Sequence, residues 1–333
     1  MKTRRRMCLA PKGEDPACDG LAIRAHTVPR QECLSKIAED GHVLTPTFDL
    51  GKSLSKQSLD FDMRKVGVRN ASTFTGFCAK HDAEIFKSVD TGPFAGSHEE
   101  CALLLYRATA WEYYAKLHAE VVADTASSFD KGKSLAHQIG LQSTTSAYKA
   151  GVQAAILDGR NRMDELERMM LARDFSDIRS LVIEFEQVPS IVAAAVFEPD
   201  FCLSGERIQQ IGDLSKPLMP LGISLVTYGD KSYFVFSWTQ GADAIVRKFV
   251  DEYASVDPAR LATALTVLLF ETTENIYANP QWWTQLSDET KAKLLERARS
   301  GAEPGKLTPA THLQFEGEEY GPWTFKRMYW VGC

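Results

Sequence analysis

The sequence predicts an α+β protein in two parts: a small N-terminal module in residues 1–95 and a larger α+β domain in residues 96–333. Two observations predict this division. The first part is rich in Gly, Pro, Ser, Thr and Cys and has only short apolar runs, whereas the second combines long helical patterns with β-branched runs. Gly92 and Pro93 break the chain between them. A length of 333 residues fits two domains.

Composition and charge narrow the class of protein. The chain is 44% hydrophobic and 25% charged, which is typical of a soluble globular protein. No apolar run is long enough to cross a bilayer, and Cys8 with nearby prolines replaces the apolar stretch of a signal peptide. We therefore expect a cytoplasmic protein without a membrane partner. The net charge of −6 argues against nucleic-acid binding over the whole surface, but the N-terminal part has local basic residues. They are Lys2, Arg4, Arg5, Arg6, Arg24, Arg30, Lys36, Arg64, Lys65 and Arg69.

The N-terminal part is expected to hold little regular structure. Residues 30–40 form one short helix that carries Leu34 and Ile37 on its apolar side. Gly41 ends this helix, as glycine commonly does at a helix C-terminus. Residues 44–69 are interpreted as a loop or a hairpin.

Helices open the second part, over residues 98–173. Residues 99–124 are dense in Ala, Leu, Tyr and Trp without Gly or Pro, and Ser97 or His98 can cap their N-terminus. A second helical region covers residues 131–173. Its last part places one apolar stripe at helical spacing, which we interpret as core. The stripe consists of Ile156, Met163, Leu166 and Met170.

Residues 179–238 change to a strand pattern. Four β-branched and aromatic runs are bounded by Pro, Gly and Asp, and they predict an antiparallel sheet of about four strands. The runs are residues 181–185, 191–197, 221–228 and 233–238. Gly229 and Asp230, between the last two runs, indicate a hairpin turn. Helices resume over residues 241–300, with breaks before Pro258 and Pro280, and a mixed C-terminal tail follows.

Four residues of the N-terminal part have the chemistry of a metal site. Seven cysteines in a chain of this length do not indicate a disulfide framework. Zinc prefers four thiolate or imidazole ligands in a tetrahedron. Cys78 and His81 are spaced to hold one ion from a turn that enters a helix, and Cys8 with Cys18 is the nearest second pair. Cys33 is the alternative to Cys18.

The residues around this set resemble the HNH nuclease module. The two matching stretches are Ala25-His26-Thr27-Val28-Pro29 and Phe77-Cys78-Ala79-Lys80-His81-Asp82. The resemblance covers residues 8–90 and implies a treble-clef ββα fold that is held by structural Zn²⁺. It also implies that His26 is the general base and that Asp82 binds a catalytic divalent ion, Mg²⁺ or Mn²⁺.

Three positions depart from the family pattern, and the role of His26 stays open. Ala25 stands where the family often has an acid or a histidine before the base. Phe86 stands one helical turn after Asp82, where a further metal ligand is common, and Asn70 is off the spacing of the family's central Asn. The sequence therefore leaves three roles open for His26: general base, zinc ligand, or structural residue that caps the following helix.

Three functions are compatible with these residues. The first is a metal-dependent nuclease that cleaves phosphodiesters of DNA or RNA. The second is a non-catalytic zinc-finger protein that binds nucleic acid or a protein partner, with the C-terminal region as an interaction scaffold. In the third, residues 96–333 carry an unrelated activity and the module is purely structural.

Overall fold

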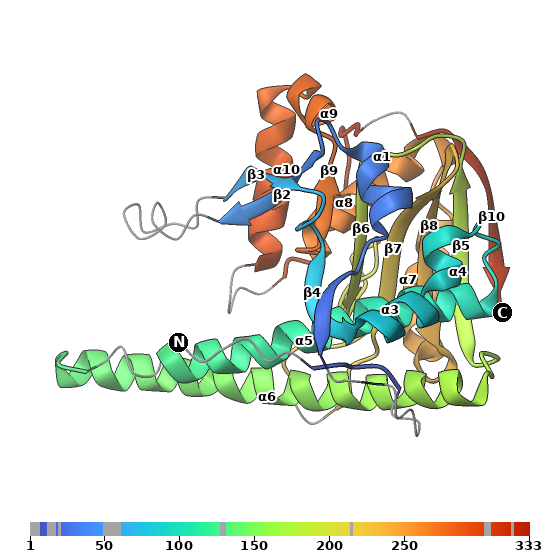
Figure 1. Cartoon of the computed structure of the whole chain (residues 1–333). Coiled ribbons are helices and arrows are strands. Elements are labelled where there is room, and N and C mark those ends of the chain that lie inside the picture. The colour runs from blue at the N-terminus through green and yellow to red at the C-terminus, as the bar shows by residue number, and fades with distance from the viewer. Residues whose placement is uncertain are drawn as a thin grey trace.

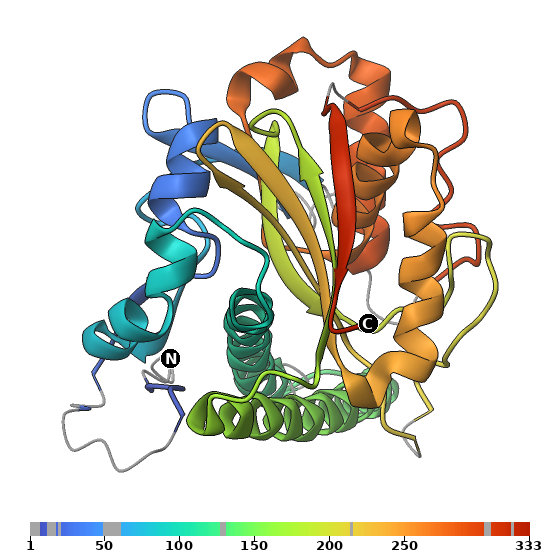
Figure 2. The ribbon, with the colours of Figure 1, turned by 90° about the vertical axis from the view of Figure 1, so that its right-hand side faces the viewer.

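A computed structural model describes residues 7–11, 18, 21–48, 61–126, 131–213, 216–302, 308–320 and 323–333. Its centre is a large antiparallel sheet with helices on both faces (Figure 1). Turning the molecule shows the sheet between two groups of helices, one from the N-terminal half of the chain and one from the C-terminal half (Figure 2). Within the described ranges, no helix is long and apolar enough to cross a membrane.

The sheet has eight strands, so the expectation of about four strands was wrong. The four predicted runs are present as β5 (Ile178–Phe185), β6 (Ile191–Phe197), β7 (Leu221–Tyr228) and β8 (Lys231–Thr239). The additional strands are β2 (His42–Phe48), β3 (Phe61–Gly67), β9 (Ile276–Ala278) and β10 (Phe325–Val331). The strand order is β10-β5-β8-β7-β6-β9-β2-β3. The predicted hairpin between β7 and β8 is confirmed, because Tyr228 pairs with Lys231 around a two-residue turn in which Gly229 has φ +59°.

Alternating side chains of the central strands build two cores, one on each face of the sheet. In β5, Val182 faces the first core, whereas Leu181 and Ile183 face the second. The strands are therefore buried on both sides, and this explains why they are continuous apolar runs rather than alternating ones.

Two long helices lie on the first core. They are α5 (His98–Ala126) and α6 (Leu135–Ala172). Ser97 caps α5 through a reciprocal pair of bonds: its hydroxyl accepts from the Glu100 amide at 3.2 Å, and the Glu100 carboxylate accepts from the Ser97 amide at 2.9 Å. The predicted stripe of α6 is confirmed as core, since Met163 and Leu166 are buried there. Its other two members pack against the same cluster.

The second core is covered by C-terminal helices. They are α7 (Asp243–Ala254), α8 (Pro258–Thr272), α9 (Pro280–Gln285) and α10 (Asp288–Ala302), with the short η3 (Gln240–Ala242) before them. The breaks that the sequence predicts before Pro258 and Pro280 are the starts of α8 and α9. Asp257 accepts a bond from the Ala259 amide at 2.8 Å, and Asn279 accepts one from the Trp282 amide at 2.7 Å.

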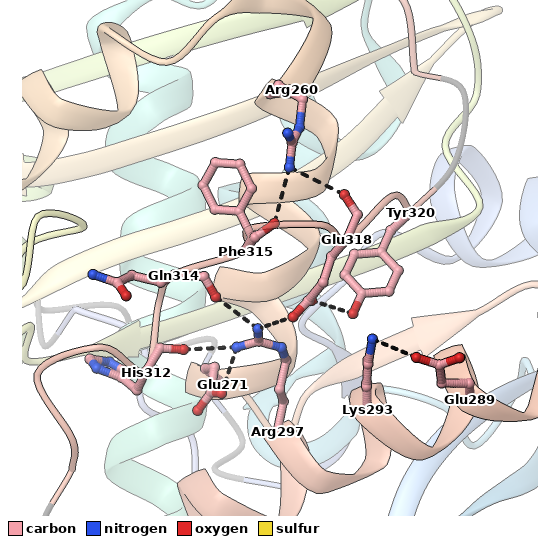
Figure 3. A network of polar contacts seen from close by, with 10 residues as sticks. All are labelled: Arg260, Glu271, Glu289, Lys293, Arg297, His312, Gln314, Phe315, Glu318 and Tyr320. Carbon is pink, nitrogen blue, oxygen red and sulfur yellow. Dashed lines mark hydrogen bonds and ion pairs between the residues drawn. The ribbon is translucent and has the colours of Figure 1, made fainter.

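Arg297 of α10, with a side chain that is 13% exposed, holds the chain segment that follows this helix (Figure 3). Arg297 binds Glu271 of α8 at 3.0 Å and Glu318 at 2.7 Å. Its guanidinium also donates to the carbonyls of His312 and Gln314, both at 2.8 Å. One side chain therefore joins two helices and the C-terminal tail.

The N-terminal part forms a second, two-stranded sheet. It pairs β1 (Ala22–His26) with β4 (Thr73–Cys78), and α3 (Ala79–Ile85) and α4 (Lys87–Thr91) follow. The helix expected over residues 30–40 is shorter: it consists of η1 (Arg30–Leu34) and α1 (Ser35–Ile37). Gly41 does not end it, because Asp40 and Gly41 form a turn that closes a bridge between Glu39 and His42.

The hairpin β2–β3 connects the N-terminal part to the main sheet. It occupies the stretch that was interpreted as a loop or a hairpin, and Leu44 of β2 pairs with Ala278 of β9. The boundary near residue 95 stays a prediction, although strands from both sides of it belong to one sheet.

Candidate metal centre

The junction of β4 and α3 brings two metal-binding side chains together. Cys78 is the last residue of β4, and its extended backbone precedes the helix as the N-cap. His81 lies in the first turn of α3, so both side chains point to the same side of the junction. The distance from the Cys78 Sγ to the His81 Nδ1 is 3.3 Å.

The other two ligand candidates come from the start of the chain. The amide of Leu9 donates to the Gly76 carbonyl at 2.7 Å, and this bond holds the N-terminal segment beside β4. The Cys8 Sγ accepts from the Cys78 amide at 3.4 Å and lies 3.3 Å from the His81 Nδ1. With Cys18, the four ligand atoms all lie within 4.8 Å of one another. These four residues form a group that could hold a metal ion.

The donor set fits a tetrahedral ion. Zinc bonds of about 2.3 Å to sulfur and about 2.0 Å to nitrogen separate neighbouring ligand atoms by roughly 3.5–3.8 Å. The His81 Nδ1 lies 3.3 Å from the Sγ of Cys8 and 3.3 Å from the Sγ of Cys78, close to this ligand-to-ligand distance. Burial raises the pKa of Cys8 to about 11, and the neighbouring Cys78 thiol adds to the rise. A bound cation would reverse this effect, because it favours the thiolate.

Cys33 lies elsewhere. It is fully buried, and its sulfur accepts from the amide of Thr227 in β7 at 3.3 Å. Among the described residues, it is not part of the metal-binding group. The structure therefore gives Cys18, not Cys33, as the partner of Cys8.

His26 lies at the end of β1, outside the metal-binding group. Its Nε2 is 3.0 Å from the Val68 carbonyl, and because a carbonyl can only accept, Nε2 carries the proton and Nδ1 keeps its lone pair. Burial lowers the pKa of His26 below its usual 6.5; the Val68 bond opposes this, and Arg30 and Arg107 add to it. His26 does not cap the helix that follows, since η1 has no side-chain cap.

Asp82 stands on α3 directly after His81. Its Oδ1 is buried and has no hydrogen-bond partner among the described residues. Burial raises the pKa of Asp82 above its usual 3.8, and Arg107 opposes that rise. A buried carboxylate oxygen without a donor is costly unless a cation or a water reaches it.

The sequence alone does not point to Arg107 in this neighbourhood, or to its pairing with Asp90. Arg107 comes from the middle of α5, is 1% exposed, and binds both oxygens of Asp90 at 2.7 Å. Both charges influence the pKa values of His26 and Asp82: Arg107 lowers them and Asp90 raises them. The available signal was an arginine inside the apolar run of α5, because such a residue needs a buried partner.

Two of the departures from the family pattern, at Phe86 and Asn70, have structural explanations. Phe86 is fully buried, packs edge-on against Phe77 and lies 3.9 Å from the Arg107 guanidinium, so it belongs to the core. Asn70 lies in the turn before β4, and its side-chain Oδ1 accepts from the Arg24 guanidinium at 2.8 Å.

No protein-family model, curated protein or solved structure matches this chain. The function of this chain is therefore inferred from the geometry of the site.

Proposed function

We propose that residues 8–90 form a zinc-held module of the HNH type, which cleaves phosphodiester bonds with the help of a second divalent ion. The supporting observation is that Cys8, Cys18, Cys78 and His81 come within 4.8 Å of one another. The order β1, β4, α3 agrees with the ββα arrangement of a treble clef, in which this ion would be structural.

His26 and Asp82 have separate roles in this proposal. His26 takes a proton from water through Nδ1 while the water oxygen attacks phosphorus, and its lowered pKa keeps the imidazole neutral at cellular pH. Asp82 would hold Mg²⁺ or Mn²⁺, and the bound ion would supply positive charge to stabilise the leaving oxygen. DNA or RNA is the substrate class, and Arg24 and Arg30 lie on or beside β1, where they can contact phosphates.

A non-catalytic zinc module is the second candidate, and one observation favours it. Phe86 is buried in the core at the position of a further metal ligand, and both oxygens of Asp90 are bound to Arg107. Neither Phe86 nor Asp90 is then available to share a catalytic ion with Asp82. In this case the module binds nucleic acid or protein without cleaving it, and the remainder of the chain is a scaffold.

Metal analysis combined with cleavage assays separates the two candidates. The full chain is assayed on plasmid DNA and on structured RNA in Mg²⁺ or Mn²⁺, together with Asp82→Asn and with Glu84→Gln, an exposed carboxylate on the same helix. The nuclease proposal expects one zinc in all three proteins and loss of cleavage only in Asp82→Asn. Full zinc content without cleavage of either substrate would favour the non-catalytic module.

A further inference from the structure

The first half of α6 has no core to pack on. It extends with the end of α5 as an arm beyond the sheet (Figure 1). None of residues 131–151 is buried, and the first buried side chain of α6 is Val152. Two polar contacts join the two helices here: Lys149 binds Asp124 at 2.7 Å, and Gln153 donates to Glu120 at 3.4 Å.

Such a helix is not expected to be stable by itself. Most helical stability in proteins comes from the packing of one face rather than from helix propensity. Residues 135–151 include Gly140 and Gly151, both with open space where a side chain would be. Each exposed helical glycine costs about 1 kcal/mol relative to alanine. The arm therefore needs packing from another source.

The outer face of the arm is apolar and almost uncharged. Leu135, Ile139 and Leu157 are 73%, 62% and 62% exposed, and intervals of four and eighteen residues put them on one side of the helix. Ser146 and Ala150 complete this stripe and are also exposed. From Leu135 to Leu157 the side chains that can carry a charge near neutral pH are His137 and Lys149, whereas surface helices normally carry many charges.

We propose that this arm pairs with the arm of a second copy of the chain to form a four-helix bundle. A second copy offers the same uncharged stripe. Pairing of the two stripes therefore buries no unpaired charge. A nucleic acid or a lipid surface would instead need a cationic face. This inference is independent of the chemistry proposed for the zinc module.

The available area is sufficient for a stable dimer. The 23 residues from Leu135 to Leu157 span about 34 Å, and a hairpin is about 20 Å wide. Such a strip hides roughly 700 Å² on each copy, and a specific interface needs roughly 1,000 Å² in total.

Sedimentation velocity of the full chain tests the pairing. We expect a species of twice the 37.0 kDa chain mass. Ile139→Glu should raise the dimer dissociation constant roughly 100-fold, because symmetry buries two charges. Leu171→Glu is the matched control: Leu171 is a 57% exposed leucine of the same helix outside the arm, and its replacement should leave the dimer intact. A monomer at every concentration, or a dimer that Ile139→Glu does not weaken, would overturn the proposal.

A cysteine in the middle of the stripe gives a second readout. Ser146 is midway between Leu135 and Leu157, so it faces its counterpart in the second copy whether the two arms run parallel or antiparallel. Ser146→Cys should form an intermolecular disulfide under mild oxidation, and Leu171→Cys should not. Equal cross-linking of the two variants would contradict pairing through this face.

Discussion

At the residue scale, the polar groups near the proposed site are held by a few buried contacts. The Val68 carbonyl selects one tautomer of His26, and Arg107 holds both oxygens of Asp90. Asp82 differs from both, because its buried Oδ1 has no hydrogen-bond partner among the described residues. A divalent ion at Asp82 would provide that missing interaction.

The first prediction concerns His26. His26→Ala should retain zinc, because His26 lies outside the metal-binding group, and it should lose about 0.5–1.5 kcal/mol of stability with the Val68 bond. Loss of the general base should lower the rate of cleavage about 10²–10⁴-fold. Zinc content, thermal melting and cleavage are measured on the same preparation.

His42→Ala serves as the control for His26, because His42 lies in the same part of the chain and its Nδ1 bonds to the nearby Asp40 carbonyl at 2.7 Å. It should cleave like the wild type. A zinc-loaded His26→Ala protein with full cleavage activity would end the nuclease proposal.

The second prediction concerns zinc. Cys78→Ser should lose the ion and unfold the module, since structural zinc supplies about 10–16 kcal/mol of apparent binding energy in isolated fingers. Cys202→Ser, which replaces a buried cysteine of the second core, should keep it. Zinc is measured by mass spectrometry of the native protein. Retention of a full equivalent by Cys78→Ser would remove Cys78 from the ligand set.

The third prediction concerns the pH dependence of stability through Glu184. This carboxylate is 1% exposed and binds Lys231, Lys326 and Arg327 at 2.6–3.0 Å. Burial opposes its ionisation, but the three cations outweigh burial and lower the pKa of Glu184 from 4.5 to about 2. Because the folded pKa is lower than the unfolded one, its contribution is present above pH 4.5 and is lost as the pH falls toward 2.

Glu184→Gln should therefore cost about 1.5–3 kcal/mol at neutral pH, and the difference from the wild type should shrink through that window. Denaturant unfolding between pH 2 and 7 measures it. Glu289→Gln removes an exposed ion pair with Lys293 and serves as the control, with no expected change. A difference between wild type and Glu184→Gln that stays constant with pH would show that Glu184 keeps an ordinary pKa.

At the element scale, single polar side chains connect neighbouring elements. Glu184 joins β5 to β8 and β10, and Arg297 joins α10 to α8 and to the C-terminal tail (Figure 3). Burial raises the pKa of Glu271 to about 7, and the Arg297 guanidinium opposes that rise. These contacts are long-range, so they depend on the complete fold.

The fourth prediction tests the network around Arg297. Arg297→Ala should cost about 3–5 kcal/mol, because it leaves buried carboxylates without their cation. The segment 308–320 should also become sensitive to protease. Arg299→Ala, which removes an exposed pair with Glu296 on the same helix, should change neither property. Unchanged stability and protease resistance in Arg297→Ala would mean that the tail is held by apolar packing alone.

At the scale of the whole molecule, the N-terminal part and the large sheet share one core. Apolar residues from both sides of residue 95 belong to a single cluster, and β2 pairs with β9. Three buried tyrosine hydroxyls also cross the expected domain boundary, each within 2.6 Å of a backbone atom. The pairs are Tyr106 with Leu9, Tyr228 with Val89, and Tyr277 with Ser72.

The fifth prediction concerns a shortened chain that begins at Ala95. It loses the partners of three tyrosine hydroxyls and exposes the first core, so we expect it to melt roughly 10 °C below the full chain. Circular dichroism and calorimetry of both proteins measure this difference. A fragment that melts cooperatively at the temperature of the full chain would establish residues 96–333 as an independent domain, as the sequence predicts.

The sequence by itself determined the local elements of this protein. The period of apolar residues predicts α5, α6 and the four central strands, since burial of one face or of both faces leaves a repeating pattern. The pairs Asp257-Pro258 and Asn279-Pro280 indicate the helix starts. The residue types and their spacing also point to Cys8, Cys18, Cys78 and His81, because few other side chains bind zinc.

Only the tertiary structure decided how these elements combine. Strands β2, β3, β9 and β10 complete the sheet through pairings between distant segments, and no local pattern encodes such pairings. The choice of Cys18 over Cys33 also depends on the fold, because the two thiols are chemically alike and differ only in their neighbours. Arg107 and Asp90 are 17 residues apart in sequence, and they meet in space because α4 and α5 pack against each other.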